Sequence, residues 1–211
     1  MIHLYAFTPP APQLPDATGI AGARLEACRV ADVVAVISEV DPGGAVRDAV
    51  VEHGLVVESL RELAEAVLPV RFGERFADRR ELVAAVGDRV ATLRESLARV
   101  RGCAEFGVRM VSERSPANVP AADGSTYMRA RLASVVEADA VATELHEPLA
   151  RCARASVVSD GAGYAAAYLV GEDEREDFEQ ALAGFVAAHP ELTVVCTGPW
   201  APYSFTGSAD G

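Results

Sequence analysis

The second half of the sequence contains six candidate secondary-structure elements whose order leaves few folds open. Residues 104–111 alternate between apolar side chains (Phe106, Val108 and Met110) and charged ones, as a strand with one buried face does. The elements that follow are predicted as helix 126–151, strands 155–159 and 164–170, helix 173–188 and strand 191–197. The order β-α-β-β-α-β is that of the ferredoxin-like fold, so we expect a four-stranded antiparallel sheet with both helices on one face.

Residues at the ends of these elements support the assignment. Asp160–Gly163 has the composition of a tight hairpin connection between two strands. Asp173 is expected to cap the helix that follows it, with Glu176 three residues later. Pro148 falls in the last turn of helix 126–151, and we expect it to end or kink that helix.

The first half of the sequence is less regular. Strands are predicted at 2–7, 32–38 and 67–73, and helices at about 45–66 and 78–101. Pro69 removes a backbone donor, so the third strand is expected at a sheet edge, or with Pro69 at its start or in a bulge. Asp78 followed by Glu81 predicts the capped start of the second helix.

Together these elements predict an α+β protein with two α/β domains and a tail. An N-terminal α/β domain is expected over residues 1–102 and a ferredoxin-like C-terminal domain over 103–197, followed by an extended tail over 198–211. Residues 198–205 of the tail combine two prolines, which are expected to preclude regular structure, with three aromatic rings. A disordered tail does not concentrate rings in this way, so the segment is expected to dock either on the same protein or on another chain. The candidate docking residues are Pro199, Trp200, Pro202, Tyr203 and Phe205.

The charge of the chain argues against two classes of partner. The net charge is −12, and all 19 basic residues are Arg. An acidic chain is a poor general binder of nucleic acid, and no apolar run is long enough to cross a bilayer. The charge is −6 over residues 1–68, +3 over 69–114 and −9 over 115–211. The basic middle stretch therefore serves either for ion pairing within the protein or for docking an acidic partner.

Motifs for catalysis and for metal or cofactor binding are missing from the sequence. A Walker loop is impossible without Lys, and the sequence has no GxGxxG, GxSxG or HExxH. The four cysteines have no CxxC spacing, so we predict no metal, no cofactor and no catalytic residue. His53 lies on the apolar stripe of helix 45–66. There it is either a hydrogen-bonded core residue or, given an orienting carboxylate and a pocket, a general base.

Two longer segments resemble one protein family. Val67–Gly73 (VLPVRFG), followed by Phe76, is similar to the VLPVRFG-x-x-F segment of the gas vesicle protein F/L family. Thr197–Phe205 (TGPWAPYSF) is similar to that family's C-terminal TGPWPPYSF signature. Shorter pieces follow in the same order: His53, Glu105–Arg109, and the helix start that contains Gly124, Ser125, Tyr127, Met128 and Arg131. The departures are Glu74, Arg75, Phe106, Cys196 and Ala201, each standing where the family more often has another residue.

The resemblance implies a role that is not enzymatic. Gas vesicles are hollow protein shells built in the cytoplasm from a small, very hydrophobic shell protein. Members of the family contact that protein and assist nucleation or assembly as minor components. The family layout is two α/β domains, the second ferredoxin-like, with an extended tail. The resemblance thus implies a chaperone-like cytoplasmic protein that is associated with gas vesicles and binds the shell protein, and possible partners include other assembly proteins.

The basic stretch supplies one candidate surface for binding the shell protein, and the aromatic tail supplies a second. The candidates in the basic stretch are Arg71, Phe72, Arg75, Phe76 and Arg79. Both sets of residues could instead brace the fold. The competing functional hypothesis is an oxygenase-type enzyme or a sensor of a small ligand on the ferredoxin-like domain, with His53 as the first residue to suspect.

Overall fold

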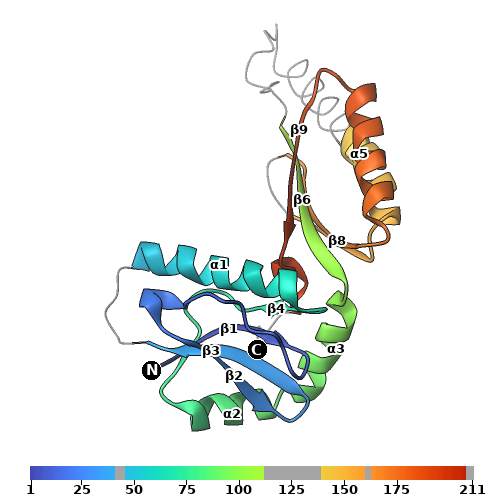
Figure 1. Cartoon of the computed structure of the whole chain (residues 1–211). Coiled ribbons are helices and arrows are strands. Elements are labelled where there is room, and N and C mark those ends of the chain that lie inside the picture. The colour runs from blue at the N-terminus through green and yellow to red at the C-terminus, as the bar shows by residue number, and fades with distance from the viewer. Residues whose placement is uncertain (41–45, 112–138, 160–162, 208–211) are drawn as a thin grey trace, which may run out of the picture. The chain divides into compact units, whose positions relative to one another are not determined.

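The computed structural model describes residues 1–40, 46–111, 139–159 and 163–207, and its helices and antiparallel sheets form an α+β protein (Figure 1). The chain forms two compact units. The N-terminal unit consists of Met1–Glu105 together with Pro199–Gly211, and the C-terminal unit of Phe106–Gly198. The chain therefore passes from one unit to the other twice, once in each direction.

The N-terminal unit is built on a five-stranded sheet. Its strands are β1 (Ile2–Thr8), β2 (Leu25–Val30), β3 (Val33–Glu39), β4 (Leu68–Pro69) and β5 (Arg75–Phe76). The strand order is β2-β3-β1-β4, and β5 also pairs with β1. All seven residues of β1 are buried, as are the first six of β3, because helices cover both faces of the sheet.

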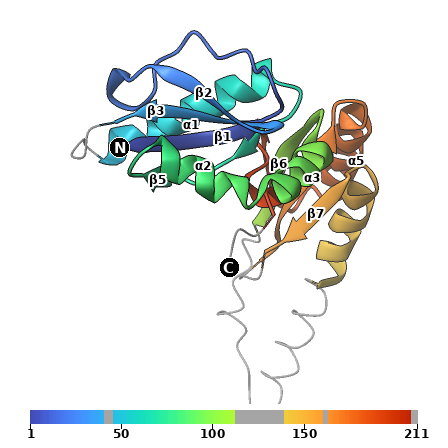
Figure 2. The same ribbon diagram turned by 90° about the horizontal axis from the view of Figure 1, so that it is seen from below.

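Three helices supply that cover. Helix α1 (Val46–Leu63) lies over one face of the sheet, and α2 (Arg79–Gly87) and α3 (Val90–Val100) lie over the other (Figure 1). Figure 2 shows α2 and α3 on the near side of β1 when the unit is viewed from below. The apolar residues of both central strands are therefore removed from water, which is the main stabilising contribution to this unit.

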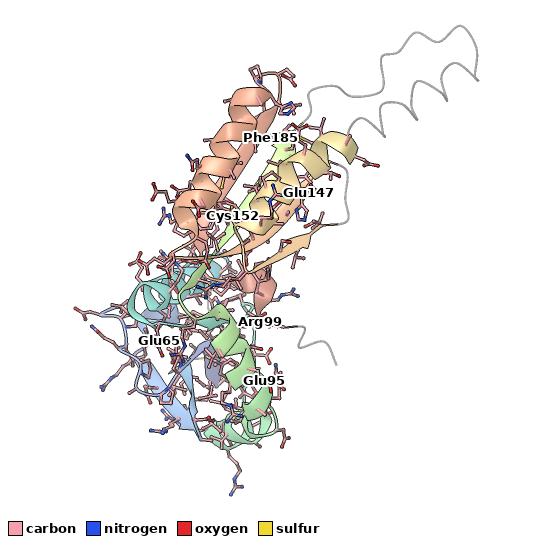
Figure 3. The ribbon with its side chains drawn as sticks, turned by 90° about the vertical axis from the view of Figure 1, so that its right-hand side faces the viewer. Glu65, Glu95, Arg99, Glu147, Cys152 and Phe185 are labelled. Atoms are coloured by element: carbon pink, nitrogen blue, oxygen red, sulfur yellow. The ribbon has the colours of Figure 1, made fainter. Side chains whose placement is uncertain are left out.

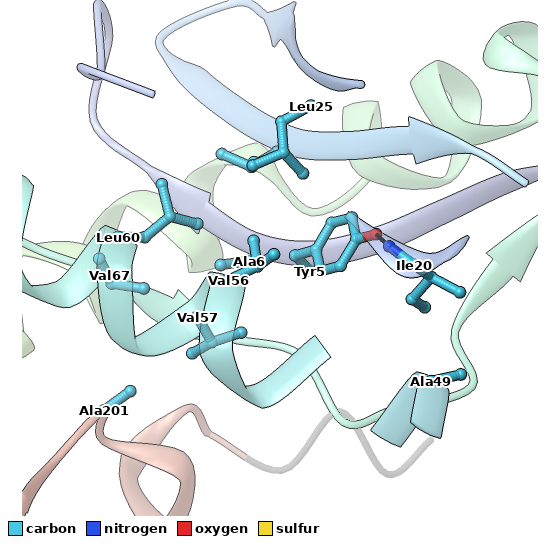
Figure 4. Close-up of a cluster of buried hydrophobic side chains, with 11 residues drawn as sticks. Tyr5, Ala6, Ile20, Leu25, Ala49, Val56, Val57, Leu60, Val67 and Ala201 are labelled. Atoms are coloured by element: carbon cyan, nitrogen blue, oxygen red, sulfur yellow. Dashed lines mark hydrogen bonds between the residues drawn. The ribbon is translucent and has the colours of Figure 1, made fainter. Parts of the chain in front are cut away.

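A β-bulge in β1 decides which side chains face α1. Leu4 lies opposite Ile37 and Ala6 lies opposite Val36, so Tyr5 is the extra residue on β1. Tyr5 and Ala6 consequently both belong to the core cluster with Val56, Val57 and Leu60 of α1 (Figure 4). The Tyr5 hydroxyl, fully buried, accepts a hydrogen bond from the Ile20 backbone N–H at 2.8 Å and lies 2.8 Å from Ser38 Oγ. Burial raises the pKa of this hydroxyl.

The C-terminal unit contains a four-stranded sheet in the order β7-β8-β6-β9. The strands are β6 (Cys103–Val111), β7 (Ala155–Val158), β8 (Ala165–Gly171) and β9 (Thr193–Trp200), and the helices are residues 139–151 and α5 (Arg175–Ala188). Phe106, Val108 and Met110 of β6 are buried, as their alternation predicts. The Phe106 ring lies 5.4 Å from that of Phe178 on α5, measured between ring centroids.

Several sequence-based boundaries need correction in the N-terminal unit. The helix expected over 78–101 is two helices, because α2 ends at Gly87 and α3 starts at Val90. Gly and Asp are poor helix formers, and both stand at this break, as Gly87 and Asp88. The sequence does not predict strand β2, because Leu25 and Val30 are its only large apolar residues and the adjacent Ala27 and Cys28, between two charged residues, do not alternate with them. The strand expected at 67–73 is only Leu68–Pro69, at the end of the strand order.

Two corrections concern the C-terminal part of the chain. Residues 198–200 continue β9, and Tyr203–Phe205 form a turn of 3₁₀ helix, so the two prolines do not preclude regular structure. Because β9 is an edge strand, the missing N–H of Pro199 is tolerated there. Asp173 does not cap α5, since Glu174 stands at the N-cap without a capping side-chain hydrogen bond. The expected connection at 160–163, the loop at 112–124 and the start of helix 126–151 lie wholly or partly outside the described residues.

Asp78 and Asp173 make a matched pair for testing these caps. The Asp78 carboxylate accepts the Glu81 backbone N–H at 2.9 Å, and the Glu81 carboxylate accepts the Ala77 N–H at 2.6 Å. We expect Asp78→Ala to lower the free energy of unfolding by about 1 kcal/mol and Asp173→Ala to change it by less than about 0.5 kcal/mol. Urea unfolding followed by circular dichroism measures both. Equal losses in the two variants would contradict the assignment.

Candidate functional site

A cavity of about 450 Å³ opens into the N-terminal unit, and we call it the unit 1 cavity. Four parts of the chain form its walls: β1, the stretch from β4 to β5, the helices α2 and α3, and residues 203–207 of the C-terminal segment, which we define as residues 199–207. Its apolar lining consists mainly of buried core residues, namely Leu4, Phe7, Leu68, Val86 and Leu93. Arg71, Arg89 and Glu74 supply charged groups, so the cavity offers both apolar and ionic contacts.

Backbone hydrogen bonds fix the stretch that leaves β4. The Val70 N–H donates to the Tyr5 carbonyl at 2.9 Å, and the Val70 carbonyl accepts from His53 Nε2 at 2.8 Å. The next two side chains then take different environments. Arg71 lines the unit 1 cavity, whereas Phe72 packs against the α1-side core, with its ring 5.6 Å from that of His3 and 5.8 Å from that of His53.

The other candidate residues of the basic stretch also lie in different environments. Phe76 lies in β5 opposite Ile2 and lines the unit 1 cavity. Arg75 lies opposite His3 and is exposed, and it does not line the cavity. Arg79 forms an ion pair with Glu26 of β2. The structure therefore brings Arg71 and Phe76 together at the cavity and places Phe72, Arg75 and Arg79 elsewhere in the unit.

The C-terminal segment is held in place by four hydrogen bonds within the N-terminal unit. The Ala201 N–H donates to Glu58 Oε1 at 3.0 Å. The Ser204 N–H and Oγ donate to the two carboxylate oxygens of Glu105 at 2.7 and 2.8 Å. The Phe205 carbonyl accepts from Arg99 of α3 at 2.9 Å; Figure 3 labels Arg99 on that helix. These bonds fix the backbone of the segment against α1, α3 and the start of β6.

The rings of the segment are not equivalent. Phe205 is 6% exposed and Pro202 is buried, while Tyr203 is half-buried and lines the unit 1 cavity. Burial, together with the charge of Glu58, raises the pKa of Tyr203 to about 12. Trp200 is 48% exposed and Pro199 is half-buried. Docking thus involves Pro202, Tyr203 and Phe205, and it leaves Trp200 largely in solvent.

His53 is part of a buried hydrogen-bonded chain. Its Nε2 donates to the Val70 carbonyl, so its Nδ1 is an acceptor, and His3 Nε2 donates to it at 2.9 Å. This arrangement leaves His3 Nδ1 as a buried acceptor without a partner among the described residues. Burial lowers the pKa of His53, and burial with the nearby charge of His53 and of Arg75 lowers that of His3 to about 4. Both rings are therefore neutral at pH 7.

The surroundings of His53 do not suit a general base. His53 is 2% exposed, and both of its ring nitrogens form hydrogen bonds within the protein. It does not line the unit 1 cavity. A base must reach the proton of a bound substrate. His53 instead positions the stretch that carries Arg71.

Metal-binding and membrane features can be assessed only over the part of the chain that the structure describes. There, no three His, Cys, Asp or Glu side chains gather in a way that could hold a metal ion. Within the same residues, no helix is both long enough and apolar enough to span a bilayer.

Some residues of the site carried no signal in the sequence. Glu58, Arg99 and Glu105 anchor the C-terminal segment across sequence separations of 99 residues or more. Ala85 and Arg89 line the unit 1 cavity from α2 and from the break between α2 and α3. Glu, Arg and Ala residues are common at protein surfaces, so only the folded structure distinguishes these five.

The sequence of the whole chain decides its relationship to known proteins. A family model described as gas vesicle synthesis protein GvpL/GvpF matches residues 1–207. The chain belongs to the gas vesicle protein F/L family.

Relatives and solved structures agree with this assignment. Gas vesicle protein F2 of Halobacterium salinarum is 32% identical over 192 residues, which cover 89% of this chain and 82% of that protein. Gas vesicle protein L of a Streptomyces species is 30% identical, over 99% of this chain and 93% of its own. The crystal structure of the gas vesicle protein GvpF from Anabaena has a TM-score of 0.83 at 18% identity, covering 97% of this chain and 95% of that one. GvpF from Microcystis aeruginosa gives a TM-score of 0.80 at 17% identity, over 97% and 98% of the two chains.

Phe205 and Trp200 test how the C-terminal segment stabilises the N-terminal unit. Phe205→Ala removes a buried ring, and we expect it to lower the free energy of unfolding by about 3 kcal/mol. Trp200→Ala removes a larger but exposed ring from the same segment, and the expected loss is below about 1 kcal/mol. Urea unfolding followed by circular dichroism compares them, and a larger loss for Trp200→Ala would show that the docking is described wrongly.

The two buried histidines predict that stability depends on pH. The unfolded chain takes up a proton at His3 as the pH falls below about 6.5, whereas the folded protein does not until about pH 4. The free energy of unfolding should therefore fall with pH, and His3 alone should account for about 2 kcal/mol of that fall between pH 7 and pH 5.

Glutamine variants separate this contribution from the rest of the protein. We expect His3→Gln to flatten the dependence of unfolding free energy on pH between pH 7 and pH 5. The matched control is His189→Gln, because carboxylates of Glu144 and Glu191 raise the pKa of that partly exposed histidine. A group with a raised pKa stabilises the folded state at low pH, so this control should not flatten the curve. If the unfolding free energy of His3→Gln depends on pH as strongly as that of the unsubstituted protein, the prediction is wrong.

Proposed function

We propose that this protein is a non-enzymatic component of gas vesicle assembly that binds the small hydrophobic shell protein and prevents its aggregation. The observation that carries the proposal is the meeting of two distant segments at the unit 1 cavity. One segment, in the first half of the chain, contributes Leu68–Arg71 and Phe76 to the lining. The other, near the C-terminus, contributes Tyr203 and Ser204. These are the segments by which the chain resembles the gas vesicle protein F/L family.

The chemistry of the protein supports a role as a soluble partner. A shell protein that exposes apolar surface before assembly is an aggregation hazard. A partner with a net charge of −12 keeps a complex soluble by charge repulsion. The unit 1 cavity offers that apolar surface a place to bind, because Leu4, Phe7 and Val86 line it. Arg and aromatic side chains are favoured anchors of protein interfaces, and Arg71, Phe76 and Tyr203 are present at this cavity.

The remaining sequence-based candidates have other roles in this proposal. Trp200, which is 48% exposed, is available as an additional contact for the partner. Phe72 and Arg79 support the unit through the His3–His53 cluster and the ion pair with Glu26. Arg75, which is exposed, remains a candidate contact outside the cavity.

Two further points belong to the same proposal. We infer a ferredoxin-like arrangement for the C-terminal unit, and its strand order β7-β8-β6-β9 with α5 between β8 and β9 supports this. We also infer that the protein acts in the cytoplasm in association with gas vesicles and their other assembly proteins. Membership of the gas vesicle protein F/L family supports the association with gas vesicles.

Two alanines of α2 provide a matched test of the proposal. Ala85 is exposed and lines the unit 1 cavity, whereas Ala84 is exposed and does not. Ala85→Trp should fill the cavity and reduce the amount of shell protein captured by about tenfold, while Ala84→Trp should leave capture unchanged. The measurement is coexpression with the shell protein of the same organism. The shell protein that stays in the supernatant and copurifies with the tagged chain is then quantified.

The coexpression experiment has two outcomes that count against the proposal. If the shell protein is soluble but does not copurify with the unsubstituted chain, the proposed binding role is contradicted. Equal capture by both tryptophan variants would retain binding but place it outside the unit 1 cavity. Melting temperatures of both variants should match that of the unsubstituted protein, which separates lost binding from lost folding.

A further inference from the structure

Two exposed arginines at the unit 1 cavity have no counterion among the described residues. Arg71 and Arg89 both line it, and among the residues that the structure describes neither forms an ion pair or a side-chain hydrogen bond. Other arginines of the N-terminal unit do form ion pairs, namely Arg61, Arg79, Arg94 and Arg101. The whole chain has a net charge of −12, but these two guanidinium groups, on two different walls, make the unit 1 cavity locally positive.

The two guanidinium groups come from different parts of the fold. Arg71 follows β4, and Arg89 lies in the break between α2 and α3. Buried side chains line the cavity alongside them: Leu4 is 2% exposed, Val86 3% and Leu93 5%. Glu74 adds one negative charge to the lining, so its formal charge is +1. A ligand suited to this cavity therefore combines apolar groups with a single carboxylate.

We propose that the unit 1 cavity binds a short segment of the shell protein in which apolar side chains flank one acidic residue. This rests on the proposed function, which supplies a protein as the partner. Each planar guanidinium group can donate two parallel hydrogen bonds to the oxygens of a carboxylate, and the apolar lining buries the neighbouring side chains. A volume of about 450 Å³ lies in the range of binding pockets and holds only a few side chains.

Glu74 refines what the segment contains. Its carboxylate repels a second acidic residue, so a segment with one acidic residue fits better than a run of them. Substitutions at Glu74 and at the arginines should therefore change the binding affinity in opposite directions. Removing the charge in Glu74→Gln should strengthen binding, whereas removing either guanidinium should weaken it.

The test uses short synthetic peptides that tile the shell protein of the same organism, with binding measured by fluorescence anisotropy on the full chain. We expect binding to be confined to peptides that contain an acidic residue among apolar ones. In the Arg71→Gln, Arg89→Gln double variant the dissociation constant should rise by about tenfold or more. Replacing the acidic residue of the peptide by its amide should cause a similar loss, and the two losses should not add when combined.

Matched variants make the result specific. Arg24 and Arg80 are exposed arginines of the same unit that do not line the cavity, so the Arg24→Gln, Arg80→Gln double variant changes the net charge equally. We expect it to leave peptide binding within about twofold. Glu74→Gln should lower the dissociation constant, and Ala85→Trp should abolish binding.

Each remaining outcome overturns the inference. The first is an equal rise in the dissociation constant in the two arginine double variants. The second is binding of peptides that have no acidic residue. The third is tighter binding of decanoate than of any peptide. The last result would indicate a site for a fatty acid. If no peptide binds while the intact shell protein is still captured in coexpression, the inference fails and the proposed function stands. If the intact shell protein is not captured either, the proposed function fails as well.

Discussion

The docking of residues 199–207 onto the N-terminal unit is the interaction on which the rest of the site depends. Glu58, Arg99 and Glu105 bind the backbone of this segment, and Phe205 fills a buried position beneath it. The unit 1 cavity has a complete wall only because Tyr203–Gly207 lies there. The C-terminal residues are thus an integral part of the N-terminal unit, although they follow the C-terminal unit in sequence.

A second constraint acts from the opposite face of the sheet. The bulge at Tyr5 turns two consecutive residues of β1 toward α1, and the hydrogen-bonded chain from His3 through His53 to the Val70 carbonyl fixes the backbone beside it. Arg71 is the next residue after Val70 in the chain. A buried polar network on one side of the sheet therefore determines where a charged side chain stands on the other. Protonation of either imidazole would place a charge in this buried network, so the stability of the N-terminal unit depends on pH.

Local patterns predicted much of this structure and little of the site. Alternation at Phe106, Val108 and Met110 and the cap at Asp78 are determined by neighbours in sequence, and the structure confirms both. Strand β2 and the break at Gly87–Asp88 were missed, because small residues and a single glycine give weak signals that tertiary packing overrides. Two of the four cavity walls, the stretch after β4 and residues 203–207, contain motifs that the sequence shows separately. That Arg71 and Tyr203 share one cavity depends on contacts between residues more than 100 positions apart, for which no periodicity exists.

The double passage of the chain between its units has a consequence for protein synthesis. Residues 199–207 leave the ribosome only after the whole C-terminal unit has been made, so the N-terminal unit emerges first and waits for its last piece. Until then Phe205 is missing from its place, and the backbone partners of Glu58 and Glu105 are absent. A nascent chain therefore carries an unfinished cavity, and translation itself sets the order in which folding and partner capture take place.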